Sequence, residues 1–208
     1  CVFQLESDMF KDYLKEMKPT CFDDVAATTA LLRPGPLSAG MHHQYAKRKQ
    51  GKEDLVIPLR GIENILSNTY YVIPYQENVM QISKQVSGFD DNQADSLTRK
   101  ILAKKKVDQM PMLERCHIYG KKNYEGPVGW EQDDKAPWYD PKGKYGPEIK
   151  GAIANGYTEK EMKDYFELIQ GFSSYLFNKS HAVAYSFTSM LTTWLKLYYP
   201  VEFYAAYL

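Results

Sequence analysis

Three groups of side chains in this sequence could bind anions. Lysine and arginine are concentrated in two runs, from Lys47 to Lys52 and from Arg99 to Lys106. The third group is the turn Asn178-Lys179-Ser180-His181, which precedes an apolar helical pattern and therefore lies at a helix N-terminus with its free N–H groups. Tyr175 and Phe177 flank that turn, and rings beside cations can hold a nucleobase and its phosphates. Each group favours phosphate binding, although a solvated surface is the ordinary alternative for a basic run.

The acidic residues do not form a recognisable metal site. Two-metal phosphoryl transfer needs carboxylates that converge on a pair of ions, commonly from alternate residues of a strand. The one alternating pair, Glu159 and Glu161, lies at a predicted helix start, and the other acidic pairs are adjacent in sequence. Adjacent residues on a strand point to opposite faces, so these pairs cannot converge. The adjacent pairs are Asp23-Asp24, Asp90-Asp91 and Asp133-Asp134.

The sequence motifs of other phosphate, metal and nucleophile sites are incomplete. Gly35 and Gly40 have the spacing of a phosphate-binding P-loop, but Met41 and His42 stand where that motif requires Lys and Ser or Thr. The pairs His42-His43 and Cys116-His117 have no partners at metal-ligand spacing, so structural or surface roles fit them better. No nucleophile lies in a recognisable elbow.

Composition indicates a folded globular chain. The 208 residues are 44% apolar and 14% aromatic, enough for one domain or two small ones, and 26 basic residues balance 26 acidic ones. The longest uncharged stretch near the C-terminus, Ala182 to Leu195, is shorter than the ~20 residues of a membrane helix. Three distant cysteines and no secretion signal favour a reducing, cytoplasmic setting. Since the chain begins at Cys1 rather than Met, we expect truncation from a longer protein or a protein-splicing junction.

The elements expected to position these residues are mainly helical. Apolar spacing, caps and prolines predict helices, a rigid Pro-Gly-Pro turn, and extended segments at the start and before the third helix. The helices are expected from Ser7 to Pro19, from Asp23 to Leu32, from Gln76 to Val86, from Gln93 through the Arg99 run, from Thr158 to about Tyr175, and from Ser180 or His181 to Tyr198, with a short one after Pro200; the rigid turn is Arg33 to Pro36 and the second extended segment is Tyr70 to Pro74.

The segment from Tyr119 to Ile149 differs from the rest because it is rich in Gly, Pro and aromatic residues. Flexible linkers rarely contain two tryptophans, so we predict an ordered loop. Trp130 and Trp138 are expected to pack on the rest of the chain and the lysines to point outward.

Six motifs occur in an order that resembles one family, the bacterial replicative DNA polymerases of family C, whose polymerase subunit is the alpha subunit of DNA polymerase III. The motifs are VFQLES (2–7), LRPGPL (32–37), Arg48-Lys49 with Gly51, VIPYQE (72–77) with VMQI (79–82), Arg99-Lys100 with Lys104-Lys105, and FNKSHA (177–182). The resemblance runs from end to end of the chain and implies the fingers region that follows the palm, a mainly α fold with short β segments.

The resemblance also implies functional roles. The catalytic aspartates of the family, and the Mg²⁺ that they bind, belong to palm strands N-terminal to this chain, so no catalytic residue is expected here and this fragment alone should be inactive. The implied partners are template-primer DNA, the incoming dNTP, the palm and thumb, and replisome components such as a sliding clamp, with no membrane. The implied dNTP-binding residues are Arg99, Lys100, Tyr175, Lys179 and His181, and the implied DNA-binding residues are Arg33, Arg48, Lys49, Lys104 and Lys105.

The chain departs from the family pattern at several places. One residue is in excess around Thr98, and the segment 119–149 is absent from most members. Such departures are typical of a divergent member, such as one carried by a phage. The predicted organisation is a first fingers part (1–118) with the basic helix, an inserted loop (119–150) and a second fingers part (151–208) with the FNKSH motif. The single-residue departures are Leu176 for a small residue, Gln50 for His, Ala103 for Gly and Cys1 for Gly or Ala.

The alternative hypothesis is a non-catalytic, helical nucleic-acid-binding module that uses the same basic residues on phosphates alone. Dependence on a complementary incoming nucleotide would separate the two hypotheses, because only the polymerase needs one.

Overall fold

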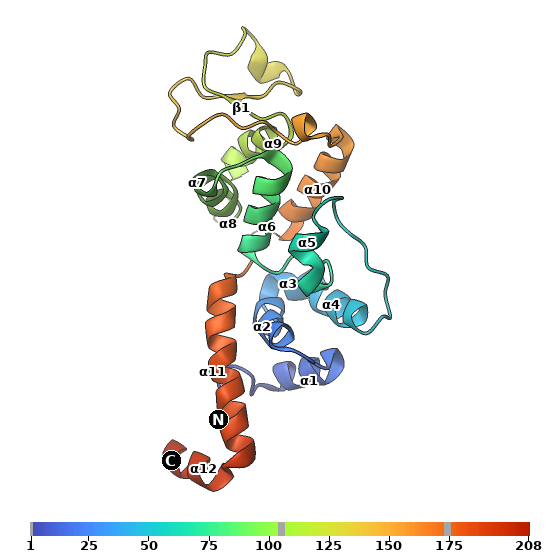
Figure 1. Ribbon diagram of the computed structural model, residues 1–208, viewed down its shortest axis with the longest axis vertical. Helices are drawn as coiled ribbons and strands as arrows, with labels where there is room; N and C mark the ends of the chain where they lie inside the picture. Colours follow the sequence, from blue (N-terminus) through green and yellow to red (C-terminus); the bar gives the residue numbers. More distant parts are fainter. Residues whose placement is uncertain (1, 104–106, 173–175) are drawn as a thin grey trace. The chain divides into compact units, whose positions relative to one another are not determined.

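The computed structural model describes residues 2–103, 107–172 and 176–208 (Figure 1). The chain forms two compact units that are interleaved along the sequence. Unit 1 contains Cys1–Leu55, Asn68–Tyr75 and Phe177–Leu208, and unit 2 contains Val56–Ser67 and Gln76–Leu176. Both units are mainly helical, as predicted.

Unit 1 is built from six α-helices among the described residues, and α11 runs beside α2 (Figure 1). Buried Ala30, Tyr75 and Ala182 pack together there, with Phe177 against them. The small side chains of Ala30 and Ala182 let the two helices approach closely enough to bury the Tyr75 ring. The helices are α1 (Asp8–Met17), α2 (Phe22–Leu31), α3 (Pro34–Ser38), α4 (Met41–Lys49), α11 (Lys179–Tyr198) and α12 (Pro200–Tyr207), and a 3-10 turn covers Ser67–Thr69.

Three local predictions in unit 1 are wrong. The start of the chain was expected to be extended, but Phe3 to Leu5 form a turn, with a φ angle of 57° at Gln4. The Pro-Gly-Pro segment was expected to form a rigid turn, but it opens the short helix α3 because proline tolerates the first helical position, where its missing N–H costs nothing. Tyr70 to Pro74 was expected to be extended. Tyr70 and Tyr71 instead have positive φ angles of 51° and 60°, so the chain turns there. Tyr75, directly after this segment, makes a sheet-like bridge with Phe177.

The described part of unit 2 contains several short helical segments, the longer helix α10 and two strands. In chain order its helices are α5 (Glu63–Leu66), α6 (Gln76–Ile82), the π-helical turn η2 (Ser83–Ser87), α7 (Asp91–Gln93), the π-helical turn η3 (Ala94–Arg99), α8 (Lys100–Ala103), η4 (Val107–Gln109), α9 (Met110–Ile118), η5 (Trp130–Gln132), η6 (Ile153–Asn155) and α10 (Glu159–Phe172). The strands β1 (Lys121–Lys122) and β2 (Trp138–Tyr139) pair in parallel.

The π-helical turn η3 lies where we expect one residue in excess of the family pattern. A π-helix closes its hydrogen bonds from residue i to i+5, so each turn holds more residues than an α-helical turn. The turn spans Ala94 to Arg99 and therefore includes Thr98. A residue in excess near Thr98 would therefore fit within the helix.

A buried polar cluster joins η2, η3 and α9. His117 of α9 is fully buried, and its Nε2 lies 3.2 Å from the hydroxyl of Thr98 and 3.4 Å from that of Ser83. Its Nδ1 lies 3.3 Å from the hydroxyl of Ser87. Burial lowers the pKa of His117 to about 3, so the imidazole is neutral and shares its hydrogen bonds with three hydroxyl groups. His117 has the structural role that the sequence favours for it.

The segment expected to be an insertion, called the insertion below, begins and ends at one point of unit 2. Gly120 and Gly151 lie so close that a Cβ on Gly151 would stand 2.4 Å from the Gly120 nitrogen. Lys121 and Ile149 then exchange backbone hydrogen bonds of 2.9 and 3.0 Å. Both glycines have positive φ angles, 90° and 83°, so this crossing depends on glycine at both positions.

Partly buried aromatic side chains pack against one another within the insertion. The rings of Trp130 and Trp138 lie 5.3 Å apart edge to face, and Arg115 of α9 donates hydrogen bonds to the carbonyl oxygens of Trp130 and Glu131. One expectation is corrected. Lys121 does not point outward, because its fully buried ammonium group is satisfied by Asp140 at 3.3 Å, the Gly146 carbonyl at 2.8 Å and the Asn123 side chain.

Candidate functional site

Arg99 and Lys100, two of the predicted dNTP-binding residues, share one carboxylate in unit 2. Arg99 Nε lies 2.5 Å from Asp95 Oδ1, and Lys100 Nζ lies 3.0 Å from Asp95 Oδ2. The hydrogen bond from Arg99, followed by that from Lys100, holds the pKa of Asp95 below its usual value, while the same carboxylate raises the pKa of Arg99. The three groups are charged together and carry a net charge of one positive unit.

Both cations keep hydrogen-bond donors available for a ligand. The side chains of Arg99 and Lys100 are 34% and 46% exposed. A guanidinium has five N–H donors, and only the Nε donor of Arg99 is engaged among the described residues. The terminal guanidinium nitrogens can therefore bind phosphate oxygens in the two-pronged geometry that arginine favours.

A second polar group lies at the start of α11 in unit 1. Asn178 caps the helix, since its Oδ1 accepts hydrogen bonds from the backbone N–H of His181 at 2.8 Å and from the Ser180 hydroxyl at 2.7 Å. Lys179 Nζ lies 5.7 Å from the centre of the Tyr75 ring. His181 is exposed, and its ring lies between those of Phe177 and Tyr185, at 5.3 and 4.0 Å. This helix start offers N–H groups, a cation and rings together.

Arg33 adds a cation beside the same group. Its guanidinium lies 4.6 Å from the centre of the Phe177 ring, which keeps it next to the rings at the start of α11. Its Nε also donates to the carbonyl oxygen of Thr29 at 3.2 Å. The side chain is half-buried and leaves terminal nitrogens for an anion.

Arg48 and Lys49, predicted to contact DNA, have partners within unit 1. The Arg48 side chain is 6% exposed; it bonds Glu53 at 3.1 Å and lies 3.4 Å from the carbonyl oxygens of Tyr70 and Tyr71. The Lys49 side chain is 7% exposed and lies 3.2 Å from buried Asp24. These contacts hold local structure, and a role in DNA binding stays a prediction.

The ion pair of Lys49 explains the state of Asp24. Burial alone would raise the pKa of Asp24, but the Thr20 N–H and the Lys49 ammonium group reverse that effect and lower it. The Tyr45 hydroxyl, at 3.1 Å, donates a further hydrogen bond. Asp24 is therefore a charged anchor between α2 and α4.

Tyr175, Lys104 and Lys105 lie outside the described residues. Of the remaining predicted dNTP-binding residues, Arg99 and Lys100 belong to unit 2, and Lys179 and His181 to unit 1. Arg99 and Lys100 meet at Asp95, whereas Lys179 and His181 both lie in the first turn of α11 and contact different rings. A shared pocket of all of them stays a prediction.

Sequence reasoning missed Asp95. Its position four residues before Arg99 is the spacing at which acidic and basic side chains meet on a helix, and this signal could have identified it.

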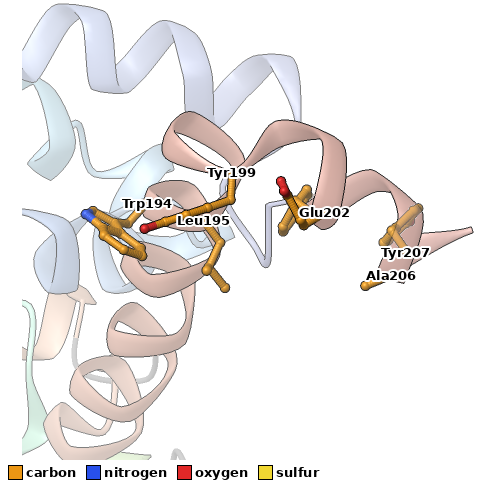
Figure 2. A pocket seen from close by; sticks show the side chains of 7 residues that line it. Trp194, Leu195, Tyr199, Glu202, Ala206 and Tyr207 are labelled. Carbon is orange, nitrogen blue, oxygen red and sulfur yellow. The ribbon is translucent and has the colours of Figure 1, made fainter.

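The described part of unit 1 also has an apolar pocket, which differs from the cationic groups above. A pocket of about 650 Å³ between α11 and α12 is lined by Trp194, Leu195, Tyr199, Glu202, Phe203, Ala206 and Tyr207 (Figure 2). Glu202 is the one charged side chain among these residues, and it is acidic. The pocket is therefore unsuited to a triphosphate.

Within residues 2–103, 107–172 and 176–208, no group of three or more potential ligand side chains could hold a metal ion. Over the same ranges, every helix is too short or too polar to cross a bilayer.

A family model settles the relationship. The model for the bacterial DNA polymerase III alpha subunit finger domain matches residues 1–124. This chain belongs to that family. The match covers the basic segment with Arg99 and Lys100, so the fingers region implied by the motifs is confirmed.

Curated relatives support the same assignment over nearly the whole chain. The DNA polymerase III subunit alpha of Aquifex aeolicus is 42% identical over 204 residues, which are 98% of this chain and 15% of that protein. The corresponding proteins of Pasteurella multocida and Escherichia coli K12 are 37% and 36% identical over 210 residues, 99% of this chain and 15% of each protein. The chain thus spans about 15% of the length of these relatives. Carriage by a phage stays a prediction.

Proposed function

We propose that this chain is the fingers region of a DNA-directed DNA polymerase, where it binds the incoming dNTP and the template-primer. The observation that carries the proposal is the Arg99–Lys100 pair, two successive cations on η3 and α8 that are partly exposed and keep unused donors. The chain belongs to the finger-domain family, and this supports nucleotidyl transfer as the reaction to which the pair contributes.

The chemical task of these residues is positioning and charge neutralisation. Phosphoryl transfer spreads negative charge over the oxygens of the transferred group, and fixed cations stabilise that charge without forming a covalent bond. In this proposal Arg99 holds phosphate oxygens through its terminal nitrogens and Lys100 adds a point charge. Lys179, His181 and Tyr175 complete the pocket, with rings for the base and the α11 N-terminus for a phosphate.

Other parts of the polymerase supply the rest. Mg²⁺ and its carboxylate ligands belong to the palm, and the described residues of this chain hold no set that fits the ion. The palm, the thumb and replisome components such as a sliding clamp are the proposed protein partners, and the cytoplasm the proposed location. The proposed DNA-binding residues are Arg33, Arg48, Lys49, Lys104 and Lys105, and within unit 1 Arg48 and Lys49 also form ion pairs with Glu53 and Asp24. The 208-residue chain alone should not extend a primer.

The test is steady-state nucleotide incorporation by the full-length polymerase carrying Arg99→Ala. Loss of a charge-assisted contact should reduce kcat/KM for dNTP by roughly ten- to 150-fold, because such contacts contribute about 1.5 to 3 kcal/mol. The matched control is Lys163→Ala, which removes a partly exposed cation paired at i,i+4 with Glu159. The control should leave incorporation unchanged.

Unchanged incorporation by a folded Arg99→Ala enzyme would refute the proposal. A loss of DNA affinity that is equal with and without dNTP would instead favour a nucleic-acid-binding module that acts on phosphates alone.

A further inference from the structure

Asp95 contacts both cations of the proposed nucleotide site. The carboxylate uses one oxygen for each, at 2.5 Å from Arg99 Nε and 3.0 Å from Lys100 Nζ. All three side chains are between 34% and 46% exposed, so the group lies at the surface of unit 2 and can meet a ligand.

The π-helical turn explains how one carboxylate reaches two successive residues. In an α-helix, residues i and i+4 are neighbours, whereas residue i+5 is rotated well away from residue i. A π-helical turn is closed by i to i+5 hydrogen bonds, so it brings residue i+5 back beside residue i. Asp95 is residue i of such a pair, and Arg99 and Lys100 are residues i+4 and i+5 around η3.

The buried side of the same turn is fixed as well. Thr98, which precedes Arg99, has its hydroxyl 3.0 Å from that of Ser83 and 3.2 Å from the His117 ring. The turn is therefore held from inside by hydroxyl groups and a ring, and from outside by the Asp95 carboxylate. Rotation of η3 about its axis would break both sets of contacts.

We propose that Asp95 is a positioning residue for the incoming nucleotide, which orients Arg99 and Lys100 so that their remaining donors face the triphosphate. The inference rests on the proposed function and deepens it. Asp95 bonds the Nε of Arg99 and leaves its terminal nitrogens unused among the described residues. This contact therefore orients the guanidinium group and does not block phosphate from its terminal nitrogens. Partly exposed ion pairs are weak, so the several charges of a triphosphate are not excluded by one carboxylate.

The test is Asp95→Asn in the full-length polymerase, which keeps the shape of the side chain and removes its charge. We expect the KM for dNTP to rise about fivefold, with kcat within about twofold, since the cations lose orientation while the reacting groups stay in place. Asp95→Glu, which restores the charge, should recover part of the lost affinity. DNA affinity without dNTP should not change.

The matched control is Asp91→Asn. Asp91 forms a similar surface ion pair, 2.5 Å from Lys84, but contacts neither Arg99 nor Lys100. This control should leave the KM for dNTP unchanged. In a background that carries Arg99→Ala and Lys100→Ala, Asp95→Asn should have no further effect, because Asp95 acts through those two side chains.

Each contrary outcome has a distinct meaning. An unchanged KM in Asp95→Asn overturns the inference, and a lowered KM overturns it by showing that the carboxylate competes with phosphate. If Arg99→Ala also leaves incorporation unchanged, the proposed function itself fails. If Arg99→Ala is impaired while Asp95→Asn is not, only the positioning role is lost.

Discussion

The buried His117 should make the stability of this chain depend on pH. Its ring contacts hydroxyl groups and the rings of Phe89 and Phe166, and burial is the cause of its low pKa. As the pH falls, the unfolded chain takes up a proton near pH 6.5, whereas the folded chain does so only near pH 3. The unfolded state therefore binds more protons between these values, and stability falls as the pH is lowered through this window.

The size of the effect follows from the two pKa values. Each pH unit within the window costs about 1.4 kcal/mol, so moving from pH 8 to pH 5 should remove about 2 kcal/mol of unfolding free energy through His117 alone. His42, whose pKa is also lowered by burial, and the carboxylates add their own dependence. A comparison with a variant that keeps those groups isolates the contribution of His117.

The assay is urea unfolding at pH 8 and pH 5 of the unsubstituted chain and of His117→Gln. Glutamine keeps a donor and an acceptor for the neighbouring hydroxyl groups but does not titrate. The loss of stability between the two pH values should be about 2 kcal/mol smaller in the variant, whatever its absolute stability. An equal loss in both proteins would show that His117 is not the group that senses pH.

Two further perturbations test the insertion. Gly120→Ala should destabilise the chain by about 1 to 3 kcal/mol more than Gly129→Ala. Both glycines have positive φ, but of the two only Gly120 would place a Cβ against backbone, next to the carbonyl oxygen of Ile149. Equal losses of stability in thermal unfolding would contradict the tight crossing. Lys121→Met should cost about 3 to 5 kcal/mol, because it leaves a buried carboxylate unpaired, whereas Lys122→Met, in a partly exposed pair, should cost less than about 1 kcal/mol. Similar denaturation midpoints for the two lysine variants would disprove the burial argument.

Helices with strong local signals were predictable from the sequence. The capping box at the start of α10 is present, since Glu161 accepts hydrogen bonds from the backbone and hydroxyl of Thr158 at 2.8 and 2.7 Å. Asn178 caps α11, which begins at Lys179, one or two residues earlier than expected, and that helix ends before Pro200 as predicted. These features depend on residues within one turn of each other, so the sequence contains all the information they need.

Features that depend on distant partners were not predictable. Lys49 lies in a basic run of the kind that usually faces solvent, but its ion pair with Asp24 buries it. Lys121 is buried for the same reason, because Asp140 lies beside it in the folded insertion. The π-helical form of η3 also needs context, since its buried side contacts α9. Charge and periodicity do not specify such partners.

The crossing of Gly120 and Gly151 has a consequence for how this protein could change over generations or in the laboratory. The thirty residues between them leave and return through the same pair of glycines, so they add no distance between α9 and the chain that continues to α10. A gene could gain or lose this segment in a single step without forcing the neighbouring helices apart. The same junction is a place where a foreign domain with adjacent termini could be grafted into this chain.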